Sequence, residues 1–172
     1  MDEANTAGIN RPRWKRFRIS YGFLALCGLL LLALMFIPVM DGHHKRQSAN
    51  ESSAVATLRR VIALETQYAA AHPEKGYACD LPLLRPAGQQ QGADYDDPLA
   101  FLVTATRSGY KFALGNCFPD AKGVLTHYQT AVVPVERGVT GFRAFCADDS
   151  GVIWYDAEGS SAKCLASRRS LE

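Results

Sequence analysis

The chain lacks the short motifs that most catalytic and cofactor-binding proteins carry. Its 172 residues contain no glycine-rich phosphate loop, no nucleotide-binding fingerprint and no serine within a G-x-S-x-G elbow. Ser150 lies in "DDSGV", which is typical of a turn, and His127 lies within a predicted strand. We therefore expect no enzymatic activity, no cofactor and no small-molecule substrate.

Paired metal-ligand spacings are also missing. There is no C-x-x-C or H-x-x-x-H pair, and the adjacent His43 and His44 would point about 100° apart on a helix, which suits a single metal ion poorly. Asp94, Asp96 and Asp97 could form a calcium loop, because hard cations prefer clustered oxygens. Their alternation is too short for an EF-hand and a proline follows, so a plain turn is the alternative, and the sequence does not decide between the two.

Most of the chain carries nearly equal numbers of positive and negative side chains. Residues 41–172 hold 14 basic and 15 acidic side chains, whereas residues 1–40 hold five basic and two acidic ones. The larger part of the chain therefore has no net field to attract nucleic acid. The basic residues gather at the start, among residues 11–18.

The basic cluster precedes the longest segment without charge, residues 19–40, "ISYGFLALCGLLLLALMFIPVM". A helix of this length spans about 30 Å of hydrocarbon. The positive-inside rule then predicts a cytoplasmic tail at residues 1–18, a transmembrane helix at 19–40 and an exported domain at 41–172. A cleaved signal peptide is the alternative, but its apolar core would be shorter and would end in a small-x-small site. Cys27 in "LALCG" lacks the small preceding residue of a lipoprotein site.

The residues after this segment predict a long amphipathic helix. Residues 41–50 are polar and form either a hinge or further helix, and Asn50, Ser52 or Ser53 could cap a helix that starts there. A mainly apolar face follows at a spacing near 3.6, and His72-Pro73 ends it. That face comprises Ala54, Leu58, Val61, Ile62, Glu65, Tyr68 and Ala69.

The remaining sequence predicts a loop and then a β-meander. Residues 73–98 are rich in proline, glycine and glutamine and predict a loop with one turn of helix near 81–84, whereas residues 99–107 fit either a short helix or a strand. Alternating apolar residues predict strands at 108–117, 125–135, 141–147 and 151–157, the last two joined by a tight turn at "DDSG". The expected fold is therefore α+β, with the long helix packed on a three- or four-stranded antiparallel sheet.

This order of elements resembles that of type IV pilins and type II secretion pseudopilins. "ANESSAVATLRRVIALETQYAAAHPEKGY" is similar to the helix-to-loop stretch of one bacterial pilin-like group, "TRSGYKF" to its first strand, and "GFRAFCADDSGVIWY" to its terminal hairpin. Together these pieces cover most of residues 49–157. The resemblance implies a structural or accessory component of a pilus or secretion assembly, held in the bacterial inner membrane with its folded domain in the periplasm. Its partners would be the membrane and other pilin-like or secretion-assembly proteins.

The front of the chain departs from the family pattern. Gly22 and Phe23 stand behind a basic leader, where the resemblance implies prepilin-type processing. Counted from Phe23, the fifth position holds Cys27, where the family has a glutamate that pairs with a neighbouring subunit during assembly. This difference favours an alternative function, a stand-alone membrane-anchored module that binds a ligand or a protein.

The four cysteines of the exported domain are even in number, which in an oxidising compartment indicates two disulfides. Four cysteines allow three pairings. We favour Cys79–Cys117, which joins the loop to the first strand, and Cys146–Cys164, which fastens the tail to the hairpin.

Overall fold

The structure is a computed structural model that describes residues 21–86 and 97–171. The chain divides into two compact units, residues 1–40 and residues 41–172. Within the described residues, none of the helices combines the length and the apolar character that a membrane crossing requires.

The first helix, α1, comprises Tyr21–Ala71. Residues 41–50 are helical, which is the second of the two alternatives that the sequence left open for them. Asn50 accordingly lies inside α1, and the prediction that it or a neighbouring serine caps a helix start is wrong. The helix ends before His72-Pro73 as expected, because the residue before a proline avoids the helical region.

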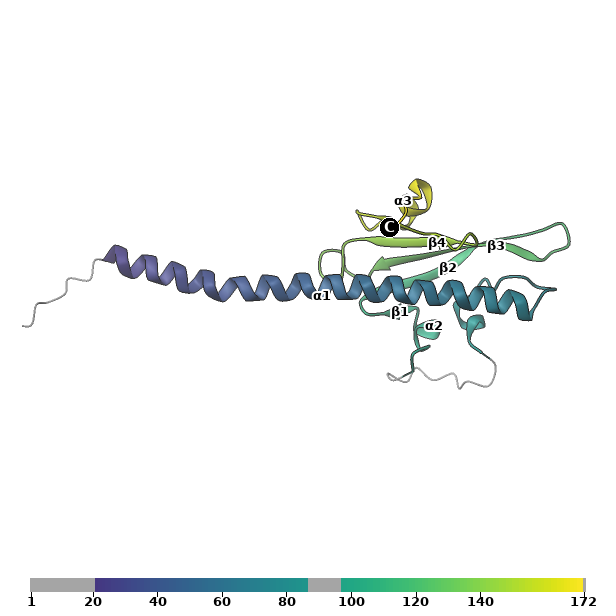
Figure 1. The fold of residues 1–172 in the computed structure, drawn as a ribbon, viewed down its shortest axis with the longest axis horizontal. Coiled ribbons are helices and arrows are strands. Elements are labelled where there is room, and N and C mark those ends of the chain that lie inside the picture. Colours follow the sequence, from purple (N-terminus) through teal and green to yellow (C-terminus); the bar gives the residue numbers. More distant parts are fainter. Residues whose placement is uncertain (1–20, 87–96, 172) are drawn as a thin grey trace, which may run out of the picture. The chain divides into compact units, whose positions relative to one another are not determined.

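The sheet is antiparallel and its five strands follow chain order. Four of them, β1 to β4, are labelled in Figure 1. The strands are β1 Thr106–Arg107, β2 Tyr110–Pro119, β3 Leu125–Pro134, β4 Ala144–Asp148 and β5 Ile153–Asp156. The last two pair as the predicted hairpin, with Cys146 opposite Trp154. The α+β class with an antiparallel sheet is therefore confirmed, and the sheet has more strands than expected.

The main core lies between residues 54–68 of α1 and one face of the sheet. Helix residues on the predicted apolar face, such as Leu58 and Val61, are fully buried. Opposite them lie alternate strand residues, which include Tyr110, Phe112 and Phe145. Strand alternation places Cys146 on the other face, where it forms a small second cluster. Both faces of β4 are thus covered, which explains why all five of its residues are buried.

Three short helical segments complete the described fold. The 3₁₀ helix η1, Leu81–Leu84, confirms the predicted turn of helix in the loop. The segment 99–107 contains both alternatives, because the helix α2, Phe101–Thr104, precedes β1. The helix α3, Ser161–Ser167, was not predicted, and its N-terminus is capped by the Ser160 hydroxyl, which accepts a hydrogen bond from the Lys163 N–H at 3.3 Å.

The C-terminal residues cover the outer edge of β5. The Tyr155 N–H donates to the Arg169 carbonyl at 2.9 Å, and the Leu171 N–H donates to the Ile153 carbonyl at 3.0 Å. These bonds satisfy backbone groups that an open edge strand would present to other chains.

Candidate functional site

Both predicted disulfides are present. Cys79–Cys117 ties the segment after α1 to β2, across 38 residues. Cys146–Cys164 ties β4 to α3, across 18 residues. The expected pairing is confirmed, although the tail that Cys164 fastens is a helix.

Gly22 and Phe23, the predicted processing site, lie in the first turn of α1. Gly22 is exposed and the Phe23 side chain is 63% exposed. Cys27, the residue in place of the family's glutamate, is a free, half-buried thiol. Cleavage after Gly22 stays a prediction.

Of the three aspartates in the candidate calcium loop, the structure describes only Asp97. Asp94 and Asp96 lie outside the described residues, whereas Asp97 forms an ion pair with Arg85. Its other oxygen accepts a hydrogen bond from the Leu99 N–H at 2.8 Å, and this bond, followed by the Arg85 interactions, lowers the pKa of Asp97 below its ordinary value. Within the described part of the chain, no group of three acidic, histidine or cysteine side chains is placed to hold a metal ion.

The other polar residues considered from the sequence have structural contacts. His127 on β3 forms an ion pair with Asp149 in the turn between β4 and β5. In the same turn the Ser150 N–H donates to Asp148 Oδ1 at 2.9 Å, so Ser150 is a turn residue as predicted. His43 and His44 are exposed on α1.

A polar contact that the sequence analysis missed joins α1 to the loop between β3 and β4. Glu51 Oε1 accepts hydrogen bonds from the N–H groups of Phe142 at 2.9 Å and Arg143 at 3.1 Å. Glu51 Oε2 lies 2.8 Å from Arg143 Nε and 2.7 Å from its Nη2, so two guanidinium nitrogens meet one carboxylate oxygen. Burial alone would raise the pKa of Glu51, but these donors outweigh burial and lower it.

Two neighbours of Glu51 extend this contact, and we call the three residues the helix clamp. The side-chain amide of Gln47 donates to the Gly138 carbonyl, and that of Asn50 donates to the Thr140 carbonyl at 2.9 Å. Gln47 and Glu51 precede Ala54 and Leu58 at helical spacing, so they continue the buried face in its N-terminal direction. The helical spacing of these two residues was the signal in the sequence that could have revealed the contact. Because both residues are polar, they resemble residues of a solvent-exposed helix face.

Gly141, in the loop between β3 and β4, packs tightly against Tyr110. A Cβ on Gly141 would lie 2.0 Å from the Tyr110 hydroxyl, so only glycine leaves room for the ring. The Tyr110 hydroxyl donates to the Arg143 carbonyl at 3.1 Å. The loop between β3 and β4 is therefore held by the sheet as well as by the helix clamp.

Glu65, on the predicted apolar face, is fully buried at 0% exposure. Its Oε2 accepts a hydrogen bond from the Ala78 N–H at 2.8 Å, whereas its Oε1 has no hydrogen-bond partner in the described structure. Burial raises the pKa of Glu65 to about 7, and the single hydrogen bond only partly offsets this. The carboxyl therefore titrates near neutral pH.

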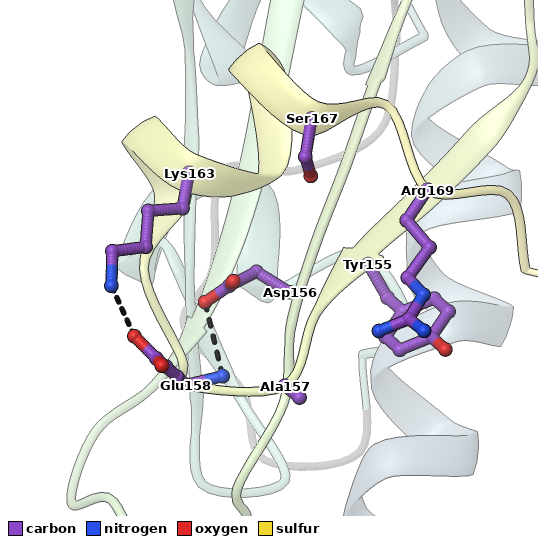
Figure 2. A pocket seen from close by; sticks show the side chains of 7 residues that line it. All are labelled: Tyr155, Asp156, Ala157, Glu158, Lys163, Ser167 and Arg169. Carbon is purple, nitrogen blue, oxygen red and sulfur yellow. Dashed lines mark hydrogen bonds and ion pairs between the residues drawn. The ribbon is translucent and has the colours of Figure 1, made fainter.

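The C-terminal region forms a shallow hollow of about 520 Å³ (Figure 2). Its charged groups are already engaged, because Lys163 pairs with Glu158 and the Arg169 guanidinium lies over the Tyr155 ring, 5.4 Å from its centre. Ser167 also lines the hollow, but none of the lining residues is a histidine that could activate it. The hollow thus offers polar contacts to a ligand at the surface.

A comparison with protein-family models, with curated proteins and with solved structures finds no match for the chain.

Proposed function

We propose that the chain is a non-enzymatic, membrane-anchored pilin-like protein, a structural or accessory component of a type IV pilus or type II secretion-type assembly. Residues 19–40 anchor it in the bacterial inner membrane, residues 1–18 lie in the cytoplasm and residues 41–172 fold in the periplasm. The proposed anchor begins outside the described residues.

The observation that carries this proposal is the apolar surface at the start of α1. Seven leucines there are 55–66% exposed, with no charged residue among them: Leu24, Leu26, Leu29, Leu30, Leu31, Leu32 and Leu34. Isolated exposed leucines are ordinary, but a continuous apolar helix surface needs a lipid or protein environment. The same helix supplies the core face of an α+β domain stabilised by two disulfides, an arrangement that supports the resemblance to pilins.

Membrane anchoring is tested by alkaline carbonate extraction of the full chain expressed in a Gram-negative host. The chain should stay with the membrane pellet and become accessible to protease once the outer membrane is opened. Replacing Leu30 and Leu31 with arginine, at a cost of about 3 kcal/mol for each charge, should release it. The matched control places arginines at Ala56 and Ala63, exposed residues of α1 within the folded unit, and should leave the chain in the pellet.

The assembly role is tested separately by incubating membranes with prepilin peptidase. Trimming after Gly22, read as a mass that begins at Phe23, supports entry into an assembly. A Gly22→Leu variant that remains full length shows that the cut is specific.

The stand-alone binding module is the second candidate, and Cys27 favours it because the assembly carboxylate is missing there. For this candidate the native chain stays membrane-bound and untrimmed. A Cys27→Glu variant that is trimmed and cross-links to a neighbouring pilin, when the native chain does not, would separate the two functions.

A further inference from the structure

The exposed apolar side chains of the folded unit are unevenly distributed. In the described part of residues 41–172, seven large apolar side chains are exposed, and three of them lie within eight residues of the loop between β3 and β4. Val135 is 61% exposed, Val139 51% and Phe142 40%, and we call these three the loop patch. The other four, Leu83, Val103, Phe118 and Val152, are scattered along the chain. Three exposed apolar side chains within one short loop make that loop the candidate contact surface of the folded unit.

The loop patch is held in its exposed position. The Gly138 N–H donates to the Gly141 carbonyl at 2.8 Å and the Thr140 N–H donates to the Glu136 carbonyl at 2.9 Å, so the loop is internally bonded. The helix clamp fixes it further through the carbonyls of Gly138 and Thr140 and the N–H groups of Phe142 and Arg143. A well-bonded loop cannot fold its apolar side chains inward, so the exposure is a property of the fold.

The chain length links this loop to the proposed membrane anchor. Gln47, which binds the loop at Gly138, lies only seven positions after Met40, the end of the proposed anchor. Such a link spans at most about 25 Å when fully extended and about 10 Å when helical. The polar headgroup layer occupies about 5–8 Å on each side of the hydrocarbon. The loop patch therefore lies within reach of the membrane surface.

The polar residues around the loop patch also suit a lipid surface. Arg46, an exposed residue, directly precedes the helix clamp, and Arg137 lies within the loop, next to Glu136. Apolar side chains flanked by basic ones are the composition of segments that lie at the headgroup boundary, where the charges meet lipid phosphates.

We propose that the loop patch rests on the membrane that holds the anchor, with Val139 and Phe142 at the boundary between headgroups and acyl chains. This contact is a second attachment of the periplasmic domain to the membrane. The inference depends on the proposed membrane anchoring.

The test places one fluorescent label on the full chain in nanodiscs that hold a single copy, which excludes contact with a second copy. In a Cys27→Ser background, Val139→Cys or Val152→Cys is labelled with an environment-sensitive dye. Val152 is the matched control, because it is also an exposed valine, 46% exposed, and it follows β4 whereas Val139 precedes it. Any attraction of the dye itself to lipid acts on both labels.

Lipids that carry a quencher near the headgroup should quench the label at position 139 by roughly half and leave the label at position 152 nearly unchanged, given a burial of about 5–10 Å at the boundary. Adding Phe142→Asp and Val135→Asp should restore the fluorescence at position 139. Equal quenching at the two positions, or no effect of the aspartates, would overturn the inference while leaving the anchor intact. A chain that fails to insert into nanodiscs at all would instead refute the anchoring, and the loop contact with it.

Discussion

Replacing Glu65 with glutamine should remove a pH dependence of stability that the native protein shows near neutral pH. Glu65 is completely buried, and in the described structure only the Ala78 N–H binds its carboxyl group. Glutamine has the same shape, and its amide oxygen can keep the bond to Ala78. The substitution therefore removes the titration with little change in packing.

The sign and size follow from the two pKa values. In the folded chain the pKa of Glu65 is about 7, against an ordinary value of 4.5. Between these values the folded state binds the proton more tightly than the unfolded state, so raising the pH favours unfolding. The stabilisation is complete below pH 4.5 and is lost as the pH rises through 7. A shift of this size at about 1.4 kcal/mol for each pH unit amounts to about 3 kcal/mol.

The assay is urea unfolding of the full chain in detergent at a series of pH values from 4.5 to 8.5. Trp154 is buried and reports on the fold, and a Trp14→Phe background leaves its fluorescence alone. Glu51 and Asp97 have lowered pKa values, and their contributions are lost at acidic pH. Subtracting the glutamine variant's unfolding free energy from the native value at each pH cancels these other groups.

The difference between native and variant should fall by about 3 kcal/mol from pH 4.5 to 8.5, with most of the change complete by pH 7.5. A difference that stays constant, or that rises with pH, would refute the reasoning. A constant difference would mean that water reaches the carboxyl group, so that its pKa is ordinary in the folded state.

Three further predictions concern stability at neutral pH. Glu51→Gln should lower the unfolding free energy by about 2 kcal/mol, since it weakens two hydrogen bonds from backbone N–H groups and a partly exposed ion pair. The matched control, Glu74→Gln, changes an exposed residue and should leave the unfolding free energy almost unchanged. Gly141→Ala should cost about 1–3 kcal/mol because the new methyl group meets a buried tyrosine hydroxyl, but Gly115→Ala, which meets no atom within 4 Å, should be close to neutral. Cys164→Ser should cost about 2–4 kcal/mol and make the last helix accessible to protease before the sheet unfolds.

Urea unfolding measures the loss of unfolding free energy in all three variants. Amide hydrogen exchange shows which part of the fold is destabilised in the Glu51→Gln variant. Equal losses for the two glutamate variants, or for the two glycine variants, would contradict the contacts from which these predictions derive.

The parts of the fold that the sequence predicted are those with a local pattern. The apolar spacing of Leu58 and Val61 identified the buried face of the helix, and alternation identified the strands that face it. The sequence left three pairings of the four cysteines open, and the pairing favoured among them is the one that the structure contains. The helix α3 escaped prediction because seven residues give periodicity too little length, and because the disulfide that ties it to β4 leaves no local pattern in the sequence.

The helix clamp escaped prediction for a different reason. Gln47 and Glu51 bind backbone groups that lie 91 residues further along the chain. A pattern within one helix shows which residues share a face, but it does not show which donors and acceptors the rest of the chain brings to that face. Polar residues there are consistent with both a solvated surface and a bonded interior.

Glu51 and Glu65 make this distinction concrete, because both lie on the buried side of one helix and their pKa values shift in opposite directions. Four donor contacts from Phe142 and Arg143 hold Glu51 ionised, and one N–H is too little to do the same for Glu65. The attachment of the loop between β3 and β4 therefore persists across neutral pH, while at Glu65 the cost of burying the carboxylate grows as the pH rises and lowers the stability of the fold.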